Sequence, residues 1–227
     1  MQERAERTRK ALLMAAATVF DRLGYDRTTL AGISEAASVS RGALSFHFSS
    51  KSALADNVQI LACASSRARL EALKGRNVPA LQTVIDMTHS AAEQLAEDPV
   101  TRASMRLAVE RGTPHDPAVH CMAVWCDVFR DAVQHAAADR SLRSGLVVRT
   151  VVRLALALVR DAYDAQRHEE SPREWLTQVW GMILPSLAEE GCARRLHADG
   201  DLPPSGRGDG HGGGQRNDEE CSRTHCR

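Results

Sequence analysis

The 227-residue sequence predicts an all-α fold, and three observations lead to this class. Apolar residues recur at helical spacing over most of the chain. In the first segment they share one face: Leu12, Ala16, Val19, Phe20 and Leu23. Valine-rich runs such as LVVRTVVRLALALV are too long for strands and carry arginine at helical intervals. Pro99, the GTPHDP stretch at 112–117, Gly145 and Pro172 separate the segments, as residues that end helices do.

Residues 1–50 are expected to form a small N-terminal domain of three helices. A first helix runs from Arg4 to Leu23, and Gly24 supplies its C-terminal stop. Thr28 or Thr29 caps a short helix over 30–37, and Ser40 caps a second short helix over 41–48. Two short helices joined by a three-residue turn, and held against a longer helix on each side, form a helix-turn-helix.

Residues 51–197 are expected to form a helical bundle that binds a ligand and dimerises. A long helix from Lys51 to about Lys74 follows two serines, and further helices are predicted over 78–97, 100–111, 118–139, 146–166 and 173–190. Apolar positions on two of them argue for a pocket: Val119, Met122, Cys126, Phe129, Val133, Val151, Leu154 and Leu158. Residues 198–227 are rich in Gly, Asp and Arg, so we expect a disordered tail.

Charge and cysteine usage narrow the location and the partners. The whole chain is neutral, with 29 basic and 29 acidic residues, but a cluster of Arg and Lys at positions 4–10 makes its beginning basic. Such an arm fits a phosphate partner, and an ordinary solvated helix face explains it nearly as well. The sequence contains no membrane-length apolar run and no signal-peptide pattern at its start. The six cysteines have no framework spacing, so we expect reduced thiols and a cytoplasmic protein without membrane partners.

The helix-turn-helix predicts a protein that binds double-stranded DNA. Its second helix enters the major groove, and the residues near the start of that helix reach base edges. Arg41 can pair with a guanine edge, and Gly42 lets backbone approach DNA closely. Thr28, Thr29 and the amide of Lys51 lie at helix starts, where free N–H groups suit phosphate oxygens. Phe46, His47 and Phe48 also have a reading without DNA contact. In that reading the two Phe side chains belong to the core, and His47 packs at the base of the domain.

The same residues carry a family resemblance. The stretch TTLAGISEAASVSRGALSFHFSSKSAL, within residues 5–60, resembles the DNA-binding segment of TetR-family repressors. More narrowly, QERAERTRKALLMAAATVFDRLGY followed by GALSFHFSSKSALA is similar to the γ-butyrolactone receptors of actinomycetes and their pseudo-receptor relatives. Ser45 departs from the family, which usually has a phosphate-contacting Tyr there. The pattern and the resemblance together give these DNA-binding candidates: Thr28, Thr29, Ser40, Arg41, Gly42, Ala43, Leu44, Ser45, Phe46, His47 and Lys51.

The resemblance also implies a regulatory ligand. The γ-butyrolactone receptors have a Trp in their pocket at the place of Trp125, with Cys63 and Val159 as its candidate neighbours here. Core packing explains Trp125 equally well. Arg160 and Asp161 give this chain a polar inventory different from that of the receptors, so a ligand other than a simple butyrolactone stays open.

The expected function is therefore a homodimeric transcriptional repressor. A small signalling molecule, γ-butyrolactone-like or another secondary metabolite, releases it from a pseudo-palindromic operator that controls secondary metabolism. One short recognition helix supplies too little specificity, whereas two copies on related half-sites supply enough. Helices 146–166 and 173–190 are the expected interface, although their apolar stripe fits intramolecular packing equally well: Trp175, Val179, Ile183 and Leu187. A regulator of an efflux or catabolic gene with an unrelated apolar ligand is the alternative.

A metal protein or an enzyme on a helical bundle is the competing class. Asp86 and His89 lie one turn apart, as di-metal bundles require, but a second such pair is missing. Cys221, His225 and Cys226 have no partner cluster at zinc-ligand spacing. Neither a Gly-rich phosphate loop nor a nucleophile elbow occurs. We therefore expect no catalytic residue, no metal and no cofactor.

Overall fold

The computed structural model describes residues 2–111, 121–165 and 171–201, and every named element within these ranges is an α-helix. This confirms the all-α prediction. The helices are α1 (Gln2–Arg27), α2 (Leu30–Ala36), α3 (Arg41–His47), α4 (Lys51–Glu71), α5 (Ala80–Glu97), α6 (Pro99–Glu110), α7 (Cys121–Ala138), α8 (Val148–Ala165), α9 (Pro172–Leu187) and α10 (Glu190–Ala193).

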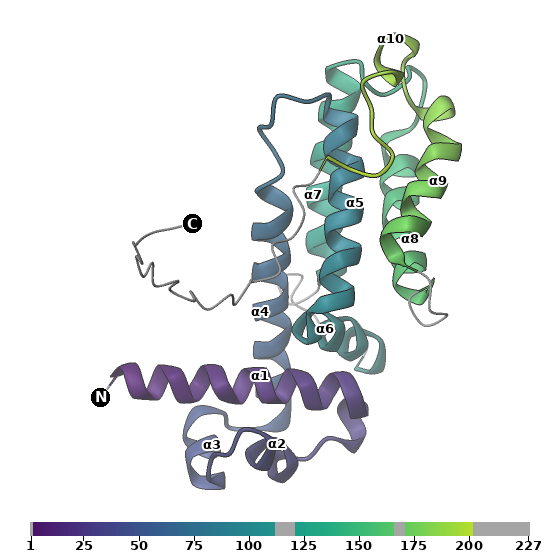
Figure 1. Cartoon of the computed structure of the whole chain (residues 1–227). Helices are drawn as coiled ribbons and strands as arrows, with labels where there is room; N and C mark the ends of the chain where they lie inside the picture. The colour runs from purple at the N-terminus through teal and green to yellow at the C-terminus, as the bar shows by residue number, and fades with distance from the viewer. Residues whose placement is uncertain (1, 112–120, 166–170, 202–227) are drawn as a thin grey trace, which may run out of the picture.

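The helices form a small N-terminal group, α1 to α3, and a larger bundle, and the long helix α4 joins the two (Figure 1). Helix α1 lies across the bottom of the molecule with α2 and α3 beneath it, and α4 rises from there along the bundle of α5, α7, α8 and α9 (Figure 1). Helix α6 crosses the base of the bundle and contacts both α1 and α4. The three N-terminal helices are thus held to the bundle by two connections, α4 and the α1–α6 contact.

Local capping residues fix where the three helices α2, α3 and α4 begin. Thr29 caps α2 and accepts a hydrogen bond from Gly32 N at 3.1 Å. Ser40 and Ser50 cap α3 and α4 in the same way, through Ala43 N and Ala53 N. Of the two threonines left open as caps, Thr29 therefore serves. Thr28 is buried, and its hydroxyl donates to Gly24 O at 2.6 Å.

Gly24 marks a break in α1 that its neighbours require. The regular helix ends at Gly24, whose backbone is non-helical, as predicted, and Tyr25, Asp26 and Arg27 belong to α1 beyond this kink. Gly24 has φ 79°, in the left-handed region that favours glycine. A Cβ at this position would also collide with the Glu110 carboxylate and the Arg106 guanidinium of α6. The break thus lets the end of α1 lie close against α6.

Residues that we expected to belong to the tail dock against α5. His89 Nε2 lies 2.9 Å from Ala198 O, and Asp201 N donates to Asp86 Oδ1 at 2.8 Å. Arg76 binds both Asp86 and Asp201 at 2.6 Å. The prediction of an undocked tail from residue 198 onward is therefore wrong for residues 198–201, because polar rather than apolar groups dock them. Residues 202–227 lie outside the described ranges.

The same contacts account for the Asp86 and His89 pair. Asp86 is fully buried and is bound by Arg76, Gln82 and the backbone N–H of Asp201, which gives it a structural role. Among the described residues, no group of three or more His, Cys, Asp or Glu side chains could hold a metal ion. Cys221, His225 and Cys226 lie outside those residues. Within the same ranges, no helix is both long and apolar enough to span a membrane.

Candidate nucleic-acid interface and ligand pocket

Helix α3 presents an exposed face at the far end of the molecule from the bundle (Figure 1). Ser40, Arg41, Gly42 and Ser45 are exposed, and Ala43 is half-buried. Leu44 is the exception among the residues expected to contact bases, because it is buried against the other N-terminal helices. The face that remains is small, polar and led by one arginine, which is the composition that a base-reading helix needs.

The aromatic residues at the end of α3 divide between the surface and the core. Phe48 is 4 % exposed and packs beneath the guanidinium of Arg9, which lies 5.5 Å from the ring centroid. Phe46 is 82 % exposed, so of its two readings core packing is wrong, and the DNA-binding position stays a prediction. His47 is half-buried and lies edge-on to the Phe46 ring at 5.2 Å. An exposed ring of this size lies on the same helix as Arg41 with no apolar partner from the core.

Lys51 and Thr28 face inward rather than toward the exposed face of α3. The Lys51 ammonium donates to Tyr25 O at 2.8 Å and to Thr28 O at 3.0 Å, and it lies 4.3 Å from the centroid of the Tyr25 ring. Its side chain thus ties the start of α4 to the α1–α2 turn. The backbone amides at the starts of α2 and α4 can still act as phosphate donors there.

Ser45 leaves a hollow between α2 and α3. The hollow has a volume of about 280 Å³ and is lined by Leu30, Ala31, Arg41, Leu44 and Ser45.

At Gly42 an added Cβ would meet nothing within 4 Å, and the backbone is helical there. The protein's own packing therefore does not require glycine at position 42.

A network of charged side chains joins α1 to α6. Arg102 Nε binds Asp21 Oδ2 at 2.8 Å, and Arg106 Nη1 donates to Asp21 O at 2.8 Å. Glu110 accepts from Arg106 at 2.7 Å and from Tyr25 N. Burial raises the pKa of the Glu110 carboxyl, but the hydrogen bonds from Arg106 and Tyr25 outweigh it and hold that pKa below its usual value. The carboxylate is therefore charged at neutral pH.

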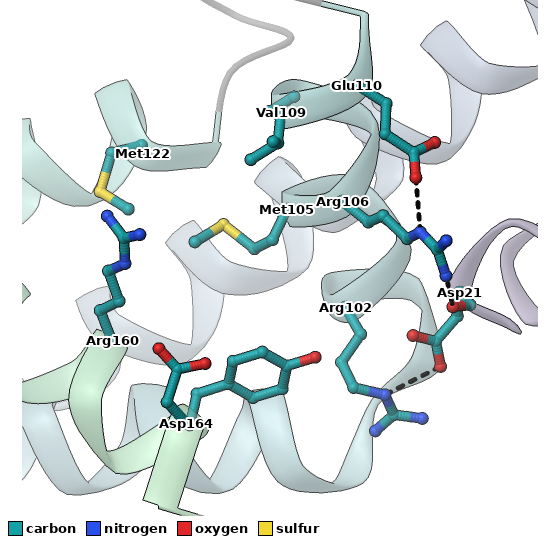
Figure 2. Close-up of a pocket in the computed structure, with 11 residues that line it drawn as sticks. Asp21, Arg102, Met105, Arg106, Val109, Glu110, Met122, Arg160 and Asp164 are labelled. Atoms are coloured by element: carbon teal, nitrogen blue, oxygen red, sulfur yellow. Dashed lines mark hydrogen bonds and ion pairs between the residues drawn. The ribbon is translucent and has the colours of Figure 1, made fainter. Parts of the chain in front are cut away.

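A pocket lies directly beside this network (Figure 2). It has a volume of about 650 Å³, and its walls come from α1, α6, α7 and α8. Apolar atoms dominate the lining, through residues that include Met105, Val109 and Met122. Arg160 and Asp164 lie across from Arg106 and Glu110, with Met105 between them and Met122 beside Arg160 (Figure 2). A pocket of this size and polarity suits a small organic molecule.

The three residues expected to bind ligand are all buried and do not line this pocket. Trp125 is 1 % exposed, Val159 is 1 % exposed, and Cys63 lies against Cys121. Trp125 follows Met122 by one turn of α7, and Val159 precedes Arg160 of the lining on α8. The indole Nε1 of Trp125 has no hydrogen-bond partner in the described structure. A buried, unpaired donor is costly, and it suggests a partner that the protein itself does not provide.

The sequence patterns did not predict that α6 forms a wall of the pocket. The buried positions of α6 include Ala103, Ser104 and Leu107. Met105 and Val109 lie four residues apart and outside that buried set, and Val109 is 84 % exposed. This spacing of apolar residues on a second face was the available signal.

Comparisons with known proteins agree with this geometry. Residues 12–58 match the model of the bacterial regulatory proteins of the tetR family. A solved γ-butyrolactone receptor (ArpA-like protein) is 29 % identical, with 86 % of this chain and 96 % of that chain covered and a TM-score of 0.74.

Two further solved structures are regulators of Streptomyces. CprB of Streptomyces coelicolor, in complex with its biological operator sequence, is 29 % identical over 85 % of this chain and 94 % of that chain, with a TM-score of 0.71. TylP, a TetR regulator of Streptomyces fradiae, is 33 % identical over 87 % of this chain and 86 % of that chain, with a TM-score of 0.62. This chain belongs to the TetR family of DNA-binding regulators, a non-enzymatic family, and its structure is similar to those of the γ-butyrolactone receptors.

Proposed function

We propose that the protein is a homodimeric repressor that a small molecule releases from a pseudo-palindromic operator. The observation that carries this proposal is a pocket built against the α1–α6 network, one helical turn from the unpaired donor of Trp125. A ligand there touches the contact that positions the DNA-binding helices. We place the protein in the cytoplasm, where its DNA is.

The proposed DNA contacts follow from exposure on α3. Arg41 reads a base edge, and Gly42 allows backbone to approach the groove, since its lack of a side chain has no use within the protein. Phe46 contacts the DNA backbone or a thymine methyl group through its exposed ring. Ser40, Ala43, Ser45 and His47 border this face. Thr29 and Lys51 contribute phosphate contacts through backbone amides, whereas Thr28 and Leu44 support the motif from inside.

The proposed ligand is a small amphipathic molecule of the γ-butyrolactone kind or another secondary metabolite. Its apolar part packs against Met105 and Met122. We infer that ligand binding opens the pocket inward past Met122, so that a carbonyl oxygen of the ligand accepts a hydrogen bond from the buried Trp125 Nε1. Val159 borders that inner end, whereas Cys63 faces Cys121 and is a weaker candidate. Arg160 gives the open end a cation, which favours a ligand that also carries a negative or strongly polar group.

Release rests on a difference in affinity between two arrangements of the helices. One arrangement can span both half-sites of the operator, and the other cannot. A ligand lowers operator affinity only if it binds the second arrangement more tightly than the first, typically by about 1–3 kcal/mol. Occupation of the pocket shifts α6, and α6 holds α1 through Asp21 and Tyr25. Helix α4 carries the same displacement to α3.

The proposed dimer uses the faces of α8 and α9. On α9, Met182 is 71 % exposed, and Trp175, Val179 and Ile183 are half-buried. Trp180 faces the other way, into the bundle, where it donates to Thr88 at 2.8 Å. Apolar side chains thus remain on the outer side of α9, as a helix–helix interface between two copies requires.

The test uses Trp125→Phe, which keeps an aromatic ring and removes the N–H donor. A complex of the protein with DNA from its own promoter region is titrated with a panel of γ-butyrolactones. We expect wild type to be released, and Trp125→Phe to keep its DNA affinity and need at least tenfold more ligand. Trp180→Phe is the matched control, because it also removes an indole donor, here the one that binds Thr88 inside the bundle and away from the pocket, and it should be released as wild type is. Equal release of wild type and Trp125→Phe would exclude this donor from the ligand site.

A regulator of efflux or catabolic genes is the second candidate. The open, mostly apolar lining with Arg160 at its edge also suits an unrelated aromatic acid. Release by such acids, and by no butyrolactone in the panel, would favour this reading.

A further inference from the structure

Two buried cysteines meet at the junction of α4, α6 and α7. Cys63 Sγ on α4 and Cys121 Sγ at the start of α7 lie 3.0 Å apart, and the Ser104 hydroxyl of α6 lies 3.2 Å from Cys121 Sγ. Both thiols are free and nearly buried, at 4 % and 2 % exposure. They are 58 residues apart in the sequence, so the fold alone brings them together.

The contact is short enough for covalent chemistry. A disulfide bond is about 2.05 Å long, so the two sulfurs need to approach by only about 1 Å. Among the described residues, no third His, Cys, Asp or Glu joins the pair in a group that could hold a metal ion. Thiol oxidation is therefore the chemistry that this arrangement favours.

The two thiols differ in a way that assigns their roles. The hydrogen bond from Cys63 lowers the pKa of the Cys121 thiol, and burial opposes this while the Ser104 hydroxyl assists it. The same hydrogen bond, together with burial, raises the pKa of the Cys63 thiol. Cys121 is thus the better thiolate and the first nucleophile. It also precedes Met122, which lines the open pocket and gives a small oxidant a short approach.

We propose that Cys63 and Cys121 form an oxidation site, at which a peroxide converts the two thiols to a disulfide that fastens α4 to α7. The Cys121 thiolate attacks one peroxide oxygen, the O–O bond breaks, and the departing oxygen takes a proton to leave as water or alcohol. Cys63 then attacks the sulfur of the resulting sulfenic acid, the S–S bond forms, and the second oxygen leaves as water. Two thiols and one hydrogen peroxide give one disulfide and two waters.

The bond acts on the helix that joins the two ends of the molecule. Helix α4 runs from the DNA-binding helices upward along the bundle, and a covalent tie at Cys63 limits its movement against α7 (Figure 1). This consequence does not depend on the identity of any ligand. The bond closes a long loop, so we expect oxidation to raise the Tm by about 10 °C. We also expect hydrogen exchange in the middle of α4 to slow by about tenfold.

The experiment oxidises the full-length protein with hydrogen peroxide and maps its disulfides by peptide mass spectrometry. Cys221 and Cys226 are first replaced by Ser, so that bonds within the C-terminal segment do not obscure the result. The expected product is a linked peptide pair containing Cys63 and Cys121, with the rise in Tm reversed by reductant. Cys121→Ser should lose both effects. Cys126→Ser, on the same helix, should keep both.

Two results would overturn the proposal. One is a peroxide-treated protein in which Cys63 and Cys121 remain thiols, or stop at separate sulfinic acids, while other cysteines pair. The other is a linked Cys63–Cys121 peptide with no change in Tm or in α4 exchange, which would mean that the bond forms only in unfolded chains. Mapping of the protein with both cysteines in place decides the first point even if Cys121→Ser folds poorly.

Discussion

Removal of the Lys51 ammonium is expected to destabilise the N-terminal helices rather than to weaken a phosphate contact. Lys51→Met keeps most of the aliphatic side chain and removes the charged donor. In the structure that donor binds Tyr25 O at 2.8 Å and Thr28 O at 3.0 Å, and it lies over the Tyr25 ring. The contact to Asp26 O, at 3.5 Å, is too long to count for much.

The size of the effect follows from these contacts. Charge-assisted hydrogen bonds contribute about 1.5–3 kcal/mol each, and the two do not count in full, because water can take the place of the ammonium at Tyr25, which is half-buried. We therefore expect a loss of about 2–3 kcal/mol in total. For a protein of this size that lowers the Tm by roughly 4–12 °C.

Thermal and urea unfolding measure this loss of stability. Operator binding at several salt concentrations tests the alternative, in which the Lys51 ammonium binds a DNA phosphate. Lys10→Met is the stability control, since Lys10 is exposed on α1 and should leave the Tm unchanged. The reasoning is refuted if Lys51→Met melts like wild type and its salt dependence of DNA binding flattens by about one unit of slope. That pair of results is what a lysine bound to phosphate would give.

Three further predictions concern other parts of the molecule. Arg41→Ala should cost about 1–3 kcal/mol of operator affinity and relax preference at one base pair, which fluorescence anisotropy on single-substitution operators measures. Truncation after Asp201 should leave the Tm unchanged, whereas truncation after His197 should lower it by several degrees, because Asp86 and His89 lose their partners; equal melting of the two would contradict the docking of 198–201. Burial lowers the pKa of His89, so the unfolded chain binds more protons below about pH 6.5, and stability should fall as the pH drops through that value. His89→Asn should show a smaller fall in urea titrations at pH 7.5 and 5.5.

Features set by neighbouring residues were predictable from the sequence. The caps Thr29, Ser40 and Ser50 accept hydrogen bonds from amides three residues away. The helices were predictable because their apolar residues recur at helical spacing, which differs from the two-residue alternation of a strand. The helix-turn-helix followed from the same local signals. The family resemblance agreed with them because it rests on the same residues.

Features set by the folded chain were not predictable in this way. Lys51 stands at a helix start, and only the fold reveals that its ammonium reaches back to Tyr25 and Thr28. Phe46 and Phe48 are two residues apart with the same side chain, yet one is exposed and the other buried. The docking of residues 198–201 depends on Asp86, more than a hundred residues earlier, and on polar contacts that an apolar pattern cannot reveal.

The most direct test of the account is a selection of binding sites from random DNA with wild type and Arg41→Ala in parallel. The proposal that α3 reads the operator as part of a dimer predicts enrichment of two symmetric half-sites, one helical turn or a multiple apart. It also predicts that Arg41→Ala loses preference at one symmetric position in each half-site and keeps the rest. An unpaired site, or the same motif from both proteins, would contradict it.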